Sequence, residues 1–122
     1  MRLKDKVAII TGGASGIGKA AADRFGQEGA ILVIADMSPA NIEAALADLT
    51  AKGCRAIGQV CDVSDQAQTQ VMAAEVVRQL GRIDILVNNA GISRYRPFAT
   101  ATGEDWDAVL NVDLKGVFFC AQ

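Results

Sequence analysis

The sequence predicts an α/β protein with a doubly wound parallel sheet, on three observations. Short apolar runs alternate with longer stretches in which apolar residues recur at helical spacing. The short runs are apolar at consecutive positions, which indicates strands that helices cover on both faces. Each run ends on a polar residue, at a nearly constant spacing along the chain. Strand and helix alternating with short connections are typical of βαβ units in a doubly wound fold.

Four strands and three intervening helices follow from this pattern. The predicted strands are Val7–Thr11, Ile31–Asp36, Arg55–Asp62 and Ile83–Asn88. The apolar faces of the helices contain Ile17, Ala21 and Phe25, then Ile42, Leu46 and Leu49, then Met72, Val76 and Leu80. Ser38-Pro39 and Ser64 predict helix starts, and Gly29, Gly53 and Gly81 predict helix ends. Residues 1–122 therefore form a single domain in this interpretation.

The carboxyl end of the sequence predicts a domain that is incomplete. Leu114–Gln122 has the pattern of an apolar helix, and no stop signal follows it. Ile83–Val87 would be an open sheet edge if no further strand lay beside it. We therefore expect a fold truncated after the fourth strand and the start of the following helices.

Composition favours small-molecule chemistry. The chain is 51% hydrophobic and carries a net charge of −2, with scattered basic residues, so we expect no nucleic-acid partner. No apolar run is long enough for a bilayer and no signal-peptide core precedes the first strand, so we expect a cytoplasmic protein without membrane contact. Three cysteines without CxxC spacing and the absence of histidine argue against a metal site and a Ser-His-Asp hydrolase.

A glycine-rich segment, T-G-G-A-S-G-I-G at residues 11–18, joins the first strand to the first helix. Glycine lets a pyrophosphate approach the backbone, and the helix start offers free N–H groups and a partial positive charge. A turn that needs glycine only for its own geometry is the alternative. The segment resembles the cofactor loop of the short-chain dehydrogenase/reductase family, which has a Rossmann-like fold. By that resemblance Gly12, Gly16 and Gly18 shape the loop, and Ser15 and Ile17 line the cofactor.

Asp36 ends the second predicted strand, where a carboxylate can accept both hydroxyls of an adenosine ribose. The same charge repels the 2′-phosphate of NADP. Ser15 and Met37 stand where NADP-preferring members of the resembled family often have basic residues. The sequence therefore predicts NAD(H) as the cofactor, with capping of the connection before Ser38 as the alternative role of Asp36.

Two further segments resemble the family's binding motifs. Asp62-Val63 resembles the pair that contacts the adenine, and helix capping is an equally open role for Asp62. Asn88-Asn89-Ala90-Gly91 resembles the family's second signature. Paired side-chain amides can tie neighbouring strand ends together, while Ala90 and Gly91 let the cofactor approach the backbone. We expect Asn89, Ala90 and Gly91 to bind the cofactor.

The resemblance also implies an activity. Asn111 opens N-V-D-L-K-G-V-F, similar to the family's helix before the active site, where the asparagine belongs to the proton relay. Family members exchange a hydride between the nicotinamide and an alcohol or carbonyl substrate, using a tyrosine and a lysine four residues later. The only tyrosine here is Tyr95, and Ala99 stands four residues on. We therefore expect the cofactor-binding half of an NAD(H)-dependent oxidoreductase, inactive by itself and a homo-oligomer in its full-length form.

Two other readings compete with the dehydrogenase. An S-adenosylmethionine-dependent methyltransferase also uses a glycine turn and acidic residues after strands two and three, so Asp36 and Asp62 do not separate the two classes. A non-catalytic dinucleotide-binding module is the third reading. Thr11 and the asparagine pair favour the dehydrogenase.

The segment after Gly91 has no assigned binding role. Arg94, Tyr95 and Arg96 are interpreted as a solvent-exposed loop, Lys115 as a surface lysine, and Trp106 and Phe118-Phe119 as core or interface residues.

Overall fold

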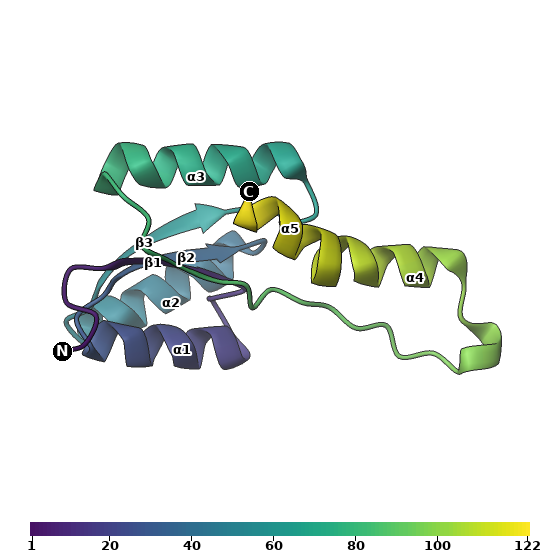
Figure 1. Ribbon diagram of the computed structural model, residues 1–122. Helices are drawn as coiled ribbons and strands as arrows, with labels where there is room; N and C mark the ends of the chain where they lie inside the picture. The colour runs from purple at the N-terminus through teal and green to yellow at the C-terminus, as the bar shows by residue number, and fades with distance from the viewer.

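A computed structural model describes all residues from 1 to 122 and contains one four-stranded parallel sheet with helices on both faces (Figure 1). The strands are β1 (Val7–Thr11), β2 (Ile31–Asp36), β3 (Arg55–Val60) and β4 (Ile85–Val87). They lie in the order β3-β2-β1-β4, and every neighbouring pair is parallel. The order reverses beside β1, which confirms the doubly wound topology predicted from the sequence.

Helices cover the sheet in two layers. They are α1 (Gly16–Gln27), α2 (Pro39–Ala51), α3 (Gln66–Leu80), α4 (Gly103–Leu110) and α5 (Gly116–Ala121). In Figure 1, α1 and α2 lie on one face of the sheet, and α3 lies on the other with α5 beside it. None of these helices has both the length and the apolar character that crossing a membrane requires.

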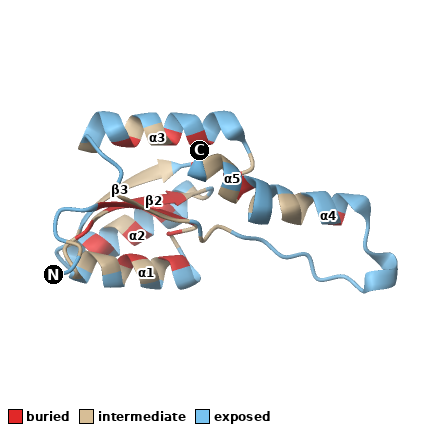
Figure 2. Cartoon of the chain, in the orientation of Figure 1, coloured by how far each residue is buried: buried red, intermediate tan, exposed pale blue.

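The core consists of two apolar clusters, one on each side of the sheet, because neighbouring strand residues point to opposite faces. On β1, Ile9 belongs to a cluster with Met72 and Val76 of α3. Its neighbour Ile10 belongs to a cluster with Ala22 of α1 and Leu49 of α2. The buried residues in Figure 2 accordingly follow the central strands and the inner sides of the helices. The expected burial on both faces is confirmed for β1 and β2, whereas no residue of the outer strands β3 and β4 is fully buried.

Two strand ends differ from the sequence expectation. The third strand ends at Val60 rather than Asp62, because the Asp62 N–H donates to the side chain of Gln68 (2.8 Å). The fourth strand covers Ile85–Val87 rather than Ile83–Asn88. At its start, the Asp84 carboxylate accepts the Val7 N–H at 2.9 Å, so a side chain replaces a backbone partner there.

Helix caps follow the sequence at most ends. Ser38 caps α2 by accepting the Asn41 N–H (3.2 Å), as predicted. The predicted start at Ser64 is wrong, because Asp65 caps α3 by accepting the Ala67 N–H at 3.0 Å. Gly81 ends α3 in the left-handed conformation, φ 80°, as expected of a glycine after the last helical turn.

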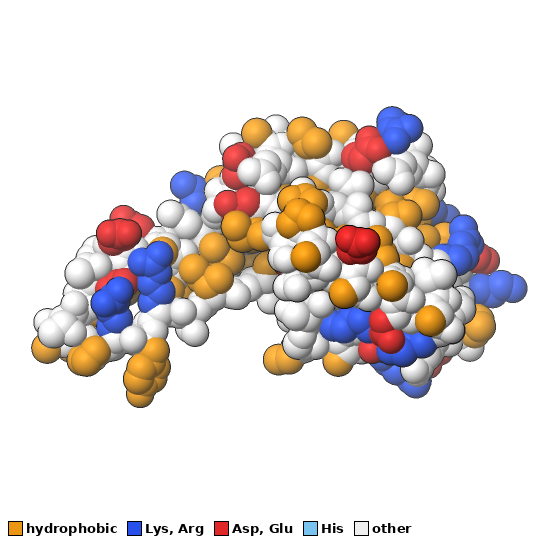
Figure 3. All heavy atoms as spheres, turned by 180° about the vertical axis from the view of Figure 1, so that it is seen from behind, with side chains coloured by type: hydrophobic (Ala, Val, Ile, Leu, Met, Phe, Trp, Pro, Cys, Tyr) orange, Lys and Arg blue, Asp and Glu red, His pale blue; other side chains and the backbone are white.

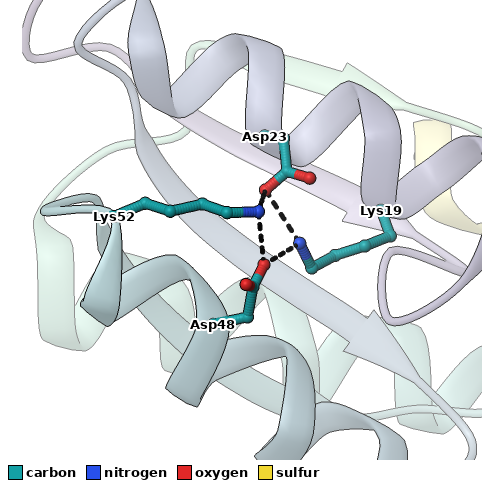
Figure 4. Close-up of polar contacts among 4 residues, drawn as sticks. All are labelled: Lys19, Asp23, Asp48 and Lys52. Carbon is teal, nitrogen blue, oxygen red and sulfur yellow. Dashed lines mark hydrogen bonds and ion pairs between the residues drawn. The ribbon is translucent and has the colours of Figure 1, made fainter.

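A ring of four charges joins α1 to α2 (Figure 4). Lys19 contacts Asp23 at 2.8 Å and Asp48 at 2.6 Å, and Lys52 contacts the same two carboxylates at 3.0 and 2.6 Å. The ammonium groups of Lys19 and Lys52 lower the pKa of Asp48 by hydrogen bonding to it. The Lys19 ammonium is thereby committed to the helix pair, although Lys19 directly follows Gly18.

After Gly91 the chain leaves the sheet and forms an arm, which we define as residues 92–110 (Figure 1). The arm contains a 3₁₀ turn at Phe98–Thr100 and α4, and a π-helical turn at Asn111–Lys115 leads back to the sheet through α5. Tyr95 and Phe98 are fully exposed, as expected of Tyr95. Trp106 and Phe118 are 67% and 61% exposed, so neither is a core residue of this chain.

Candidate functional site

The polar residues that end the strands gather along one edge of the sheet, around a cavity of about 290 Å³. This is the edge at which open α/β sheets bind their ligands. Eight of the eleven residues predicted to bind a cofactor line the cavity. The lining residues are Gly12, Ser15, Asp36, Met37, Cys61, Asp62, Val63, Asn89, Ala90, Gly91, Ile92 and Val112.

The glycine turn brings the start of α1 close to the ends of β1 and β4. Gly12 has a φ of +62°, and a Cβ atom there would lie 3.0 Å from the Ala90 Cα. A Cβ atom on Gly18 would lie 2.3 Å from the Gly12 carbonyl oxygen and 2.5 Å from the Asn89 Nδ2. Because real Cβ atoms do not approach that closely, only glycine at position 18 lets α1 begin here.

The amino end of α1 has no side-chain cap. Ser15 occupies the cap position in an extended conformation, but its hydroxyl makes no hydrogen bond to the helix. In contrast, Ser38, Asp65 and Thr102 each cap their helices through a side-chain oxygen. The first N–H groups of α1 thus keep their capacity to bind an anion, beside the partial positive charge of the helix end.

Asp36 lies beside the glycine turn. One carboxylate oxygen accepts the Ala14 N–H at 3.4 Å, and the other accepts the Ser38 N–H at 3.1 Å. The first contact joins β2 to the loop before α1, and the second orders the connection to α2. The carboxylate therefore serves the connection and also faces the cavity, so the two roles weighed from the sequence are compatible.

Asn89 ties three segments together. Its Nδ2 donates to the Thr11 carbonyl at 3.0 Å and to the Gly12 carbonyl at 3.2 Å. The Thr11 hydroxyl accepts the N–H groups of Asn89 and Ala90, both at 3.0 Å, and donates to the Val87 carbonyl. Strand ends joined by a side-chain amide were expected, and the structure assigns that contact to Asn89. Asn88 is exposed and makes no such contact.

The third strand end is shaped by a different carboxylate. Asp62 accepts the Ser64 N–H at 3.0 Å and the Ser64 hydroxyl at 2.7 Å. It therefore orders the turn, while Asp65 caps the helix, so the capping role considered for Asp62 is wrong. Its neighbour Cys61 also lines the cavity, and burial raises the pKa of the Cys61 thiol to about 11. The thiol is protonated and unreactive at neutral pH.

Three predicted residues, Gly16, Ile17 and Gly18, do not line the cavity. Gly18 instead provides the close approach described above, and the Ile17 side chain is 83% exposed. Among the lining residues that sequence reasoning missed are Ile92 and Val112. Both are apolar neighbours of recognised motifs, which is the only signal that could have indicated them.

The π-helical turn contains both Asn111 and Asp113, and only one of them meets the cavity wall. Gly116 N–H donates to the Asn111 carbonyl, the i→i+5 bond that defines the turn. Asp113 accepts the Ile92 N–H at 2.8 Å, whereas Asn111 is exposed and does not line the cavity. Sequence reasoning singled out Asn111 and missed Asp113, because the extra residue of a π-turn is not visible in helical periodicity.

Comparisons with known proteins agree with this geometry. The family model described as short chain dehydrogenase matches residues 6–122. The chain is 42% identical over its whole length to the BbsD subunit of a hydroxy(phenyl)methylsuccinyl-CoA dehydrogenase from Thauera aromatica, and 45% identical to a 3-oxoacyl-(acyl-carrier-protein) reductase from Thermotoga maritima. It covers 49% and 50% of these proteins, so it spans about half the length of the curated relatives it matches.

A solved structure adds a cofactor to the comparison. A short-chain dehydrogenase/reductase from Burkholderia phymatum, in complex with NAD, superposes with a TM-score of 0.94 and is 33% identical. The superposition covers 99% of this chain and 43% of that one. This chain therefore has the fold of roughly half of that NAD-bound protein.

Proposed function

The chain belongs to the short-chain dehydrogenase/reductase family, and from that premise we propose that its 122 residues bind NAD(H) in the strand-end cavity. The observation that carries the proposal is the uncapped amino end of α1, which opens beside the same cavity as Asp36. An anion-binding helix end and a carboxylate one βα unit later are the two groups that a dinucleotide needs from this fold.

The residues present fit a nicotinamide adenine dinucleotide. The helix start at Ser15–Gly18 is the expected position of the pyrophosphate, because the first N–H groups of α1 have no side-chain cap and Ser15 lines the cavity. Asp36 would accept the ribose hydroxyls, and Asp62-Val63 would border the adenine. Ala90 and Gly91 would border the nicotinamide half, where their small size keeps the backbone accessible.

We propose NAD(H) rather than NADP(H). The Asp36 carboxylate faces the cavity, and the adjacent Met37 offers no positive charge to a 2′-phosphate. A negative charge of the 2′-phosphate about 4 Å from the Asp36 carboxylate would be repelled by up to roughly 4 kcal/mol at an effective dielectric near 20, and solvent reduces that figure. A preference of at least tenfold for NADH over NADPH is the expected result.

The activity of the whole enzyme extends this proposal. The bound nicotinamide supplies or accepts a hydride, and the substrate is a small alcohol or carbonyl compound. Within these 122 residues no tyrosine has a lysine four positions later, so we propose that the chain binds the cofactor without turning it over. Homo-oligomeric assembly and a cytoplasmic location stay predictions.

Asn111 and Asp113 are the two candidates for a role next to the reacting groups. Asn111 carries the family resemblance, and Asp113 carries the contact with the cavity wall. Alanine substitutions separate them. Asp113→Ala frees the Ile92 N–H and is expected to weaken NADH binding, whereas Asn111→Ala is expected to leave it unchanged.

Titration of the 122-residue chain with NADH, NADPH and S-adenosylmethionine, followed by nucleotide fluorescence and calorimetry, tests the proposal. We expect NADH to bind most tightly and S-adenosylmethionine to bind weakly. Tighter binding of NADPH would refute the cofactor choice. Tighter binding of S-adenosylmethionine would restore the methyltransferase reading.

A further inference from the structure

Two arginines stand together on the arm, shortly after the last cavity residue of the preceding loop in the sequence. Ile92 lines the cavity, and Arg94 and Arg96 follow it in an extended segment. Two residues of extended chain span at most about 7 Å, so the backbone of Arg94 lies within about that distance of Ile92. Figure 3 shows the two basic side chains of the arm side by side on its surface. The NAD(H) proposal leaves both unexplained.

A single carboxylate holds this pair. Asp105 of α4 is only 7% exposed and accepts the Arg96 Nε at 3.0 Å and the Arg94 Nη1 at 3.3 Å. The same carboxylate accepts the Thr102 N–H at 3.0 Å as half of a capping box. The Thr102 N–H, followed by its hydroxyl and Arg94, lowers the pKa of Asp105 to about 2. Asp105, the anchor of the two arginines, is therefore charged at any physiological pH.

Four charged groups form this cluster. Two guanidinium groups face the buried Asp105 carboxylate, a balance of +1, and the exposed Glu104 brings the sum to zero. Glu104 lies 3.9 Å from Arg94, but its side chain is 87% exposed, so water screens most of its charge. Each guanidinium has five N–H donors and hydrogen-bonds to Asp105 through one nitrogen only. The other donors of both side chains are available, since the side chains are 38% and 56% exposed.

We propose that Arg94 and Arg96 select substrates that carry an oxyanion away from the reacting carbonyl or alcohol group. The inference rests on the proposed function, because it assigns a substrate class to the same site. Two planar guanidinium groups held by the same carboxylate suit a carboxylate, sulfonate or phosphate ligand, because each of these accepts paired N–H bonds. The oxyanion belongs either to a small acidic substrate or to the phosphate of a carrier arm.

The test uses the 122-residue chain saturated with NADH and two matched probe pairs. The first pair is 4-carboxybenzaldehyde and benzaldehyde, and the second is 4′-phosphopantetheine and pantetheine. Affinities come from NMR titrations that follow the Ile92 and Arg94 amide signals. We expect the charged member to bind more tightly in at least one pair, and the pair that shows it identifies the source of the oxyanion.

Substitutions supply the decisive readout. Because partly exposed ion pairs contribute little individually, Arg94→Gln and Arg96→Gln are each expected to weaken the charged probe about 2- to 5-fold and the double variant about tenfold. The neutral probe should not change. Glu104→Gln removes the opposing charge without touching the anchor, so it should strengthen binding of the charged probe. Arg78→Gln is the matched control, since Arg78 is an exposed arginine paired with Glu75 on α3.

Three results overturn the inference: equal affinity for charged and neutral probes, no probe binding at all, or the same affinities in Arg94→Gln/Arg96→Gln and Arg78→Gln. Loss of NADH binding in the unsubstituted chain would instead refute the proposed function, so the two failures are distinguishable. The Glu104→Gln result stays informative if the arginine variants disturb the arm, because Glu104 is exposed.

Discussion

The cavity edge and the arm are held together by different kinds of contact. At the edge, Asn89 and Thr11 are 78 residues apart in sequence, yet their hydrogen bonds join two strand ends around backbone carbonyls. In the arm, the bonds from Arg94 and Arg96 to Asp105 span 11 and 9 residues, and the nearby Tyr95 and Phe98 are fully exposed. The edge is fixed by close packing between distant segments, whereas the arm is fixed by a local charge cluster.

The edge and the arm therefore tolerate substitution to different degrees. The strand-end cavity depends on atoms held in place by several strands, and a single added methyl group disturbs such close packing. A charge cluster near solvent adapts to substitution but responds to pH and salt. The expected effects below therefore decrease from the edge to the arm.

The largest effect is expected from Gly18→Val, which attacks the packing of the edge. Its Cβ would meet the Gly12 carbonyl at 2.3 Å, so α1 must shift away from β1. We expect NADH binding to be lost and the free energy of unfolding to fall by about 3 kcal/mol or more. Calorimetry and thermal melting measure the two effects. Gly103→Ala is the control, since nothing lies within 4 Å of its Cβ, and an equal loss there would contradict the packing argument.

Asn89→Ala tests the tie between strand ends. The substitution leaves the part-buried carbonyls of Thr11 and Gly12 without their side-chain donor. Unpaired buried acceptors cost about 1–3 kcal/mol, so we expect a destabilisation of that size in urea unfolding. The exposed Asn88→Ala should be nearly neutral. Equal effects at both positions would show that the edge does not depend on this amide.

Asp36→Asn tests whether charge at the edge sets the cofactor preference, because it removes the negative charge while keeping a side chain of the same size. We expect the ratio of NADPH to NADH affinity to rise roughly tenfold, about 1.4 kcal/mol, through loss of repulsion toward the 2′-phosphate. Parallel titrations with both nucleotides measure the ratio. An unchanged ratio would mean that Asp36 does not face the ribose.

The arm should respond to acid with a smaller, local change. The pKa of Asp105 is about 2 in the folded chain, below its usual value near 4, so its contribution to stability is complete above that usual value and is lost as pH falls toward 2. Trp106, the only tryptophan, lies next to Asp105 and reports the change by fluorescence. We expect a transition between about pH 4 and pH 2. A Trp106 transition near neutral pH would contradict the buried anchor.

The fold class, the bounds of β1 and β2, and the motifs that meet at the cavity follow from the residues alone. Those features are local, because turn geometry, helix caps and consecutive apolar residues act over a few positions. The glycine turn, Asp36 and Asn89 could be placed on one edge because parallel strands end on the same side of a sheet.

Details that depend on distant partners became visible only in the folded chain. The Asp84 contact with Val7 shortened β4, and the hydrogen bond of Asp62 to Ser64 left the α3 cap to Asp65. The π-turn presented Asp113, not Asn111, to Ile92. Each outcome rests on a hydrogen bond or a helix register set by packing between segments, and such choices leave no periodic signal in the residues themselves.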